Sequence, residues 1–406
     1  MRELVNLIGY EYKKIFQRRS TWIALMVVLV LTLFGGFGTL LGDVYVEGVK
    51  AESYYTIMKK ERKALEKMEG EKLNQLFFEK VQKKAEEIYK DKSNPFQEDG
   101  SWTAEGWKQY CKFDIPYGHI SDLCTVMEKD ISTIKEEDFY KERTKFLKDN
   151  YKGEGLTDGE IQFHIKENQQ IETPFSYGNM HGFDRYFTLQ YMTGMFLAFA
   201  IAICLAPMFA GEYTSNMDSL VLSSRFGKNK LIWAKLITGV SFSVLCAIFI
   251  FGISILEIGN IYGLSGWKLP IQVSYTGFYL SLPVHMLEML GIGVGCGILA
   301  TGMIAAVVMF CSAKMKSSFG VIIISFIFIF VPVLCINAVI GIRFLYLFVS
   351  SMPTSMMYPW GTVADQLLHI GDHYFYLFQI IPILYILLIL GLALWSYHSF
   401  KNHQIA

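Results

Sequence analysis

Phe319–Ile340 reads FGVIIISFIFIFVPVLCINAVI, 22 consecutive residues without a charged side chain. A helix of about 20 apolar residues crosses the hydrocarbon core of a bilayer, so this stretch is long enough to span a membrane. Five further segments of comparable length carry at most one charge each: Trp22–Leu41, Gln190–Ala210, Leu231–Leu256, Met286–Ser312 and Tyr376–Tyr397. The sequence therefore predicts an all-α polytopic membrane protein with six transmembrane helices.

A polar segment, residues 43–188, follows the first span. It contains 23 of the 37 Lys and Arg residues and 29 of the 37 Asp and Glu residues of the chain. The net charge of zero is therefore the sum of an acidic polar segment and a basic, apolar remainder. Its apolar residues recur at three- and four-residue steps, which predicts a mainly helical domain rather than a sheet. One helix is expected through residues 65–88, ended by Asn94-Pro95, and Thr157–Glu160 is a capping-box sequence for another. Its charged face is either solvated surface or a substrate-contact surface, and the sequence leaves both open.

Basic residues in the short loops indicate the orientation of the spans. They gather in the N-terminal tail, the loop 211–230, the turn after the fourth span and the C-terminal tail, which alternate onto one side of the membrane. Under the positive-inside rule this side is cytoplasmic. The predicted organisation is a cytoplasmic segment (1–21), a first transmembrane helix (22–42), an extracellular helical domain (43–188) and the second to sixth spans (189–406), with both termini inside the cell membrane.

Two segments on the cytoplasmic side have amphipathic patterns. The N-terminal one predicts a helix lying in the membrane interface. Its apolar stripe is Leu4, Ile8, Tyr12, Ile15 and Phe16, and the opposite face carries Glu11, Lys14 and Arg18. The second begins at Gly211-Glu212-Tyr213, and a short helix parallel to the membrane is expected at 212–224, ended by Gly227. Its shared face is Tyr213, Met217, Leu220 and Ser224. Lys235, near the start of the third span, is expected to extend its amine to the interface.

The chain resembles the ABC-2 type permeases, the membrane subunits of ATP-binding-cassette exporters. The resemblance rests first on the basic segment Glu11–Trp22, which runs directly into a span. It also rests on Gly211-Glu212-Tyr213 followed by Leu220–Arg225 and Lys235, and on six spans with a large insertion after the first. Many such permeases have a Pro after the serine of the loop motif, where this chain has Ser224.

The resemblance implies a coupling helix at 212–224 that docks on a separate cytoplasmic ATPase subunit. Glu212 and Arg225 would make its polar contacts and Leu220 and Leu222 its apolar ones, with Tyr213 and Met217 on the same helix. A charge pair at such an interface contributes to register and specificity more than to affinity. The resemblance further implies a second permease copy or a paralogue as partner, and transport by ATP-driven alternating access.

The chain itself has no nucleotide-binding or catalytic motif. Before Gly227-Lys228-Asn229, Leu222 stands where a P-loop requires its first glycine, so ATP and Mg²⁺ are expected to bind the partner ATPase. His369 and His373 have the four-residue spacing of metal ligands on a helix, but Ile370 replaces the Glu of HExxH. We expect no enzyme activity, cofactor, metal or nucleic-acid partner for this chain.

Small and acidic residues inside the spans suggest packing contacts and a translocation path. Gly291, Gly293, Gly295 and Gly297 form two overlapping GxxxG pairs, which allow helix backbones to approach closely. We expect them to pack within the chain, with a dimer contact as the alternative. Glu257 and Glu288 are the acidic residues nearest to membrane depth, and such residues usually face a cavity, so they are candidates for the translocation path.

Two features of the loops remain open in the sequence. Phe344–Val349 is apolar but too short to cross the bilayer, and Pro353 and Pro359 follow it, so a re-entrant or interfacial segment is expected. Cys111 and Cys124 are the two cysteines of the polar segment, and an extracellular location would permit a disulfide between them.

The sequence thus favours a permease subunit that exports a peptide or an amphiphilic compound. The alternative is a membrane sensor or immunity protein that binds a ligand through its extracellular domain. A coupling helix favours the transporter, whereas a cytoplasmic signalling domain would favour the sensor, and the longest cytoplasmic segment expected from this topology has only about twenty residues.

Overall fold

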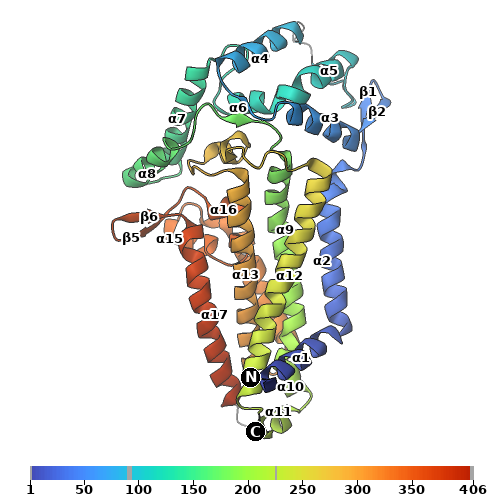
Figure 1. Ribbon diagram of the computed structural model, residues 1–406, viewed down its shortest axis with the longest axis vertical. Helices are drawn as coiled ribbons and strands as arrows, with labels where there is room; N and C mark the ends of the chain where they lie inside the picture. The colour runs from blue at the N-terminus through green and yellow to red at the C-terminus, as the bar shows by residue number, and fades with distance from the viewer. Residues whose placement is uncertain (1, 89–93, 225, 403–406) are drawn as a thin grey trace.

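Long helices dominate the computed structural model, which describes residues 2–88, 94–224 and 226–402 (Figure 1). Within these residues, six helical segments are long and apolar enough to cross a membrane: α2 with η1 (Arg19–Leu40), α9 with η3 (His181–Met208), α12 (Lys230–Tyr262), α13 (Met286–Lys314), α14 with η6 (Ser318–Val339) and α17 (Leu377–Lys401). The predicted number of helices with the length and composition of a span, six, is confirmed for the described residues. The second span starts at His181 rather than Gln190, because residues 181–189, a mixture of mainly polar and aromatic residues, extend the same helix at its N-terminal end.

The six long helices form one bundle with α13 at its centre. α13 packs against α17, α12 and α9, and α2 lies along α9 (Figure 1). Large apolar side chains on α2, α14 and α17, such as Ile23, Leu334 and Leu387, remain exposed. So extensive an exposed apolar surface is typical of helices that face lipid.

The segment between α14 and α17 folds back into the bundle. It contains α15 (Arg343–Ser350), η7 (Ser355–Met357), α16 (Pro359–Thr362) and the hairpin β5 (Leu368–Ile370) and β6 (His373–Phe375). Gln190 of α9 donates hydrogen bonds to the carbonyls of Gly293 (2.7 Å) and Met357 (3.4 Å), which holds η7 between α9 and α13. Short helices are therefore present where a re-entrant segment was expected. His369 and His373 lie on the hairpin and not on a helix.

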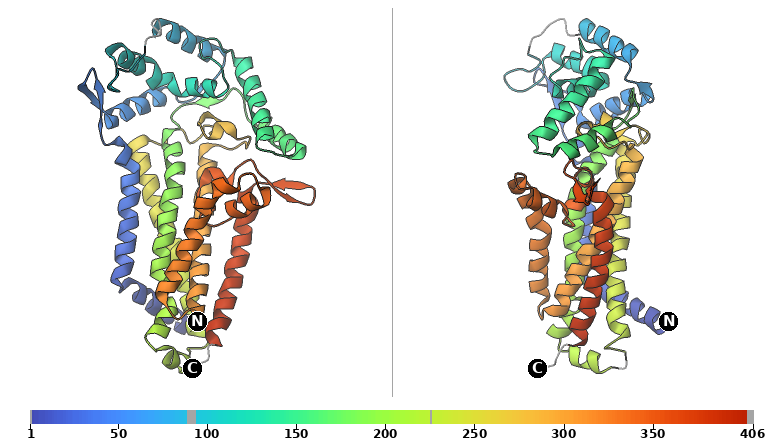
Figure 2. Two further views of the ribbon diagram at one scale, coloured as in Figure 1. Left: turned by 180° about the vertical axis from the view of Figure 1, so that it is seen from behind. Right: turned by 90° about the vertical axis from the view of Figure 1, so that its left-hand side faces the viewer.

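Residues 41–88 and 94–180 form a smaller, mainly helical unit, here called the polar domain, at the end of the bundle opposite the termini (Figures 1 and 2). Its elements are β1 (Asp43–Val46), β2 (Val49–Ser53), α3 (Tyr54–Lys67), β3 (Glu71–Lys72), α4 (Gln75–Ile88), α5 (Ala104–Gln109), η2 (Tyr110–Gly118), α6 (His119–Val126), α7 (Glu136–Gly153), α8 (Asp158–Asn168) and β4 (Ser176–Tyr177). The capping box of Thr157 and Glu160 is confirmed at the start of α8. Cys111 and Cys124 are both free thiols.

One expectation for the polar domain was wrong. The predicted single helix through 65–88 is divided into α3 and α4, because Gly70 adopts a positive φ of 84° and β3 then pairs with β4. The described part of α4 reaches Ile88, and the segment leading to the expected stop at Asn94-Pro95 lies outside the described residues. Short strand pairs, β1 with β2 and β3 with β4, also occur in the domain. They are too short for the sequence to show alternation.

Buried polar contacts attach the polar domain to the bundle. The guanidinium of Arg143 on α7 donates to the carbonyls of Phe278 (3.0 Å) and Leu280 (2.8 Å), in the connection from α12 to α13. Arg343 at the start of α15 forms an ion pair with Glu160 of α8. Burial raises the pKa of Glu160, but hydrogen bonds from Arg343 and the capping Thr157 outweigh it and lower the pKa to about 2.

Candidate functional site

A buried charged cluster lies at the end of the bundle that carries both termini. Lys235 of α12 is only 1% exposed. Its amine donates to Glu11 Oε2 (3.1 Å), Glu212 Oε1 (2.9 Å) and the carbonyl oxygen of Met208 (2.9 Å). The expectation that Lys235 extends to the interface was wrong, because these three acceptors satisfy its amine inside the protein.

Helix α1 (Arg2–Phe16) supplies the first carboxylate of this cluster. The helix was predicted with its apolar stripe against the membrane and Glu11 on the opposite, polar face. Instead α1 packs against α12, with Ile15 buried and the hydroxyls of Tyr12 and Ser241 2.8 Å apart. Glu11 is turned inward and is 1% exposed, because Lys235 offers it a partner.

Lys14 completes the cluster from the solvent side. Its amine lies 3.1 Å from Glu11 and 3.2 Å from Glu212, so two amines face two carboxylates. Burial raises the pKa of Glu212, but the amines of Lys235 and Lys14 outweigh it and hold the pKa below its ordinary value. The cluster therefore joins α1, α12 and the segment containing Glu212 through charged hydrogen bonds, which are among the stronger polar contacts in proteins.

The segment after α9 is not the single helix expected at 212–224. It forms α10 (Ala210–Thr214) and α11 (Asp218–Ser223), separated at Asn216, whose positive φ of 53° ends the first helix. Tyr213 was predicted on the shared outer face, but it is buried. Its hydroxyl donates to the carbonyl of Ala313 (3.0 Å), and its ring packs against Phe400.

The predicted docking residues therefore separate into two groups. Glu212 and Tyr213 are engaged inside the chain, in the charged cluster and against Phe400 respectively. Met217 and Leu220 are 45% and 63% exposed and form the apolar part of the loop surface. Arg225 lies outside the described residues, and so does the side chain of Leu222.

The two candidate path carboxylates occupy different environments. Glu257 packs its carboxylate directly against Gly36 of α2, and its Oε2 is buried without a hydrogen-bond partner. Glu288 is instead 58% exposed at the start of α13, where it accepts a hydrogen bond from the backbone N–H of His285 (2.8 Å). Glu288 is a helix cap, so Glu257 is the one of the pair that lies between helices.

The glycine pairs of α13 face in two directions. A Cβ at Gly293 would lie 2.8 Å from Pro359, and one at Gly297 would lie 2.8 Å from Phe251 and 3.0 Å from the amide of Gln190. Among the described residues, a Cβ at Gly291 or Gly295 would meet no atom within 4 Å other than the nearby backbone of its own helix. The Gly293 and Gly297 pair thus packs within the chain, as expected, whereas the other pair leaves an open surface.

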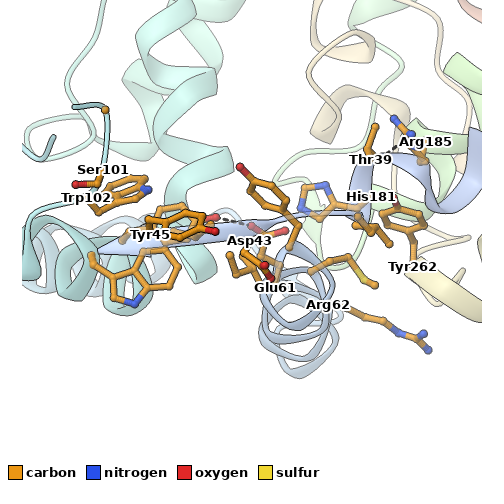
Figure 3. Close-up of a pocket in the computed structure, with 18 of the residues that line it drawn as sticks. Thr39, Asp43, Tyr45, Glu61, Arg62, Ser101, Trp102, His181, Arg185 and Tyr262 are labelled. Carbon is orange, nitrogen blue, oxygen red and sulfur yellow. Dashed lines mark hydrogen bonds between the residues drawn. The ribbon is translucent and has the colours of Figure 1, made fainter. Parts of the chain in front are cut away.

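A cavity of about 1000 Å³ lies between the polar domain and the adjacent ends of α2, α9 and α12 (Figure 3). Trp102 and Tyr45 lie at one side, and Thr39, Arg185, His181 and Tyr262 at the other. Sequence reasoning missed this cavity because its walls come from five separated segments. The aromatic residues Trp102, Trp107 and Tyr110, closely spaced in a charged segment, were the available signal.

Comparisons with known proteins add no assignment. No protein-family model matches the chain, and no curated protein matches it. Among the residues that the structure describes, no three His, Cys, Asp or Glu side chains are grouped so that they could hold a metal ion.

Proposed function

We propose that this chain is the membrane-embedded permease subunit of an ATP-binding-cassette exporter of the ABC-2 type. ATP and Mg²⁺ would bind a separate ATPase subunit. This subunit docks on residues 215–223, which follow α10 and include α11, here called the α10–α11 loop, and its contact surface includes Met217 and Leu220. Because the ATPase is cytoplasmic, both termini are also cytoplasmic and the polar domain, at the opposite end of the bundle, is extracellular. The proposal draws on the six spans, the basic character of the end that carries the termini, and the motif residues before and after the loop.

The observation that carries the proposal is the charged cluster of Glu11, Lys14, Glu212 and Lys235. Glu212 is on α10, immediately before the exposed loop, and Lys235 is in the second turn of α12. A force applied to the loop would therefore act on α12 and α1 through the contacts of Lys235 at 2.9 and 3.1 Å. The buried amine of Lys235 thus gives the loop a direct polar connection to both helices.

α12 provides a path from this cluster to the opposite end of the bundle. Its 33 residues correspond to a length of about 50 Å at 1.5 Å per residue. Tyr262 at its far end lines the cavity below the polar domain. ATP-driven closure of two ATPase subunits would move α12 as a unit and change the contacts around that end, which is the basis of alternating access.

The partner permease would be a second copy or a paralogue. The surface at Gly291 and Gly295, where a Cβ would meet no described residue of another element within 4 Å, allows a close approach of another helix along α13. Peptides or amphiphilic compounds are the proposed cargo.

The test is co-purification of the ATPase from native membranes, with ATPase activity measured on the complex. Met217→Asp/Leu220→Asp places two charges on the exposed surface of the loop and should abolish recovery of a P-loop ATPase. Leu76→Asp, at a 74% exposed position of the polar domain, is the matched control and should leave recovery unchanged. Equal recovery in both variants would reject docking at this loop.

The cavity below the polar domain favours one second candidate, a membrane sensor or immunity protein that binds a ligand without transport. This candidate predicts ligand binding and no ATPase partner. Absence of any co-purified ATPase across several mild detergents, together with saturable ligand binding, would select it over the exporter.

A further inference from the structure

The cavity between the polar domain and the bundle has an aromatic wall. Tyr110 lies at the centre of this wall, with its ring centroid 5.2 Å from that of Trp102 and 5.3 Å from that of Trp107. All three rings line the cavity, together with Tyr45, Tyr54 and Tyr262. Such π faces attract positively charged groups, and clusters of them recognise quaternary ammonium ions.

A carboxylate is fixed beside these rings. Glu61 of α3 lines the cavity, and its Oε1 accepts a hydrogen bond from the Tyr110 hydroxyl (2.8 Å). Burial raises the pKa of Glu61, and the hydrogen bond from Tyr110 opposes that rise. One hydroxyl uses only part of the acceptor capacity of a carboxylate, so Glu61 retains lone pairs for a ligand.

The positive groups of the cavity are engaged elsewhere. The guanidinium of Arg62 donates to Glu66 (2.7 Å) and to the carbonyls of Asn260 and Ile261, and Figure 3 shows it pointing away from the other lining residues. Arg185 donates to the carbonyl of Gly35 and the hydroxyl of Thr39, both at 2.9 Å. Neither arginine therefore neutralises Glu61.

Further carboxylates line the same space. Asp43, Asp99 and Asp184 join Glu61 in the lining, and the ion pair of Asp43 with Lys50 (2.8 Å) leaves three carboxylates against the two engaged guanidiniums. Asp184 Oδ1 is buried without a hydrogen-bond partner. The cavity thus combines a negative balance with an aromatic wall, and its volume of about 1000 Å³ is at the upper end of that of small-molecule sites.

We propose that this cavity binds an amphiphilic organic cation, with the positive group held between Glu61 and the rings of Trp102, Trp107 and Tyr110. The apolar part of the ligand extends toward Leu40 and the ends of α2 and α12. Recognition is a property of this chain and needs no ATPase, so it stands whether or not the chain is an exporter subunit.

The experiment measures binding of radiolabelled tetraphenylphosphonium to the full-length chain in lipid nanodiscs by equilibrium dialysis, with empty nanodiscs subtracted. Tetraphenylborate, which has a similar shape and the opposite charge, is the matched probe. Glu61→Gln removes the charge and keeps an acceptor for Tyr110, and should weaken binding roughly tenfold, the change expected when a charged hydrogen-bonding partner is neutralised. Glu79→Gln, on α4 outside the cavity, should bind as the parent chain does.

A second variant keeps the test decisive if Glu61→Gln impairs folding. Trp107→Leu retains every carboxylate and removes one aromatic face, and should weaken phosphonium binding by about threefold or more. The parent chain should bind tetraphenylphosphonium saturably and tetraphenylborate only as empty nanodiscs do. Saturable binding of both probes with equal affinity, binding unchanged by both cavity variants, or no saturable binding would overturn the proposal.

Discussion

Replacing Lys235 by Met is the perturbation that most directly probes the charged cluster. The side chain is 1% exposed, and methionine has a similar length and no charge. The change leaves the carboxylate of Glu11 buried, with Lys14 as its remaining charged partner, and removes one of the two amines that face Glu212. It also leaves the carbonyl of Met208 without its amine donor.

The magnitude follows from these contacts. Removing one member of a buried ion pair typically costs about 3–5 kcal/mol, because the remaining charge is left without compensation. Lys14 is 47% exposed and its pairs are screened by solvent, so Lys14→Met should cost no more than about 1 kcal/mol. Glu11→Gln should fall between these values, because Lys235 keeps Glu212 and Met208 as acceptors.

The assay is thermal unfolding of the purified chain in one detergent, together with limited proteolysis in the loop 211–230. Lys235→Met should lower the transition temperature by at least about 5 °C relative to Lys14→Met and should expose the loop to cleavage. Equal stability of these two variants would refute the reasoning that Lys235 holds the loop to α1 and α12.

Three further predictions test other parts of the molecule. Burial lowers the pKa of His119 to about 4, assisted by the neighbouring His181 and opposed by the hydrogen bond to Val273. The neutral His119 side chain therefore contributes to stability above pH 6.5, and this contribution is lost as pH falls toward 4. Thermal unfolding followed from pH 7 to 4.5 should therefore show a loss of at most about 3 kcal/mol in the parent chain and a smaller loss in His119→Gln, and equal losses would contradict this assignment. Gly297→Leu should destabilise the chain by about 1–3 kcal/mol through overlap with Phe251. Gly295→Leu should leave monomer stability unchanged and weaken any dimer seen by light scattering. Equal destabilisation by both variants would be contrary to the structure. A membrane-impermeant maleimide applied to intact cells should label Glu137→Cys above the level of the parent chain and leave Ser215→Cys unlabelled until the cells are lysed, and the reverse pattern would invert the topology.

The long apolar segments could be predicted from the sequence because the requirement behind them is local. A span needs about 20 apolar residues in succession, and each of the six carries its own signal regardless of its neighbours. The capping box at Thr157 was predictable for the same reason, since its two partners are three residues apart. The segment Phe344–Val349 was predicted to be re-entrant or interfacial because it is apolar but too short to cross the bilayer.

The charged cluster could not be predicted, because its members are distant in sequence. Glu11 and Lys235 are separated by 224 positions. The sequence placed Glu11 on the polar face of an amphipathic helix and the amine of Lys235 at the membrane interface, and both local interpretations were wrong. A buried charge becomes acceptable only when a partner from another helix is present, and that partner is a tertiary property.

The loop 211–230 and the cavity show the same limit. The shared helical face of Tyr213 and Met217 assumed an unbroken helix, but Asn216 adopts a positive φ and turns the chain between them. The cavity depends on how α3, α5 and the β1–β2 hairpin sit above the ends of the spans, so its residues could be named only after the fold was known.

The central claim, that a separate ATPase drives this chain through the α10–α11 loop, is tested most directly by site-specific photo-crosslinking in native membranes. A photoreactive residue at Leu220, 63% exposed on α11, should give a single major adduct with a protein that contains a P-loop, identified by mass spectrometry. The same residue at Leu76 on the polar domain should not give that adduct. No adduct at Leu220, or the same P-loop protein captured equally from both positions, would contradict the claim.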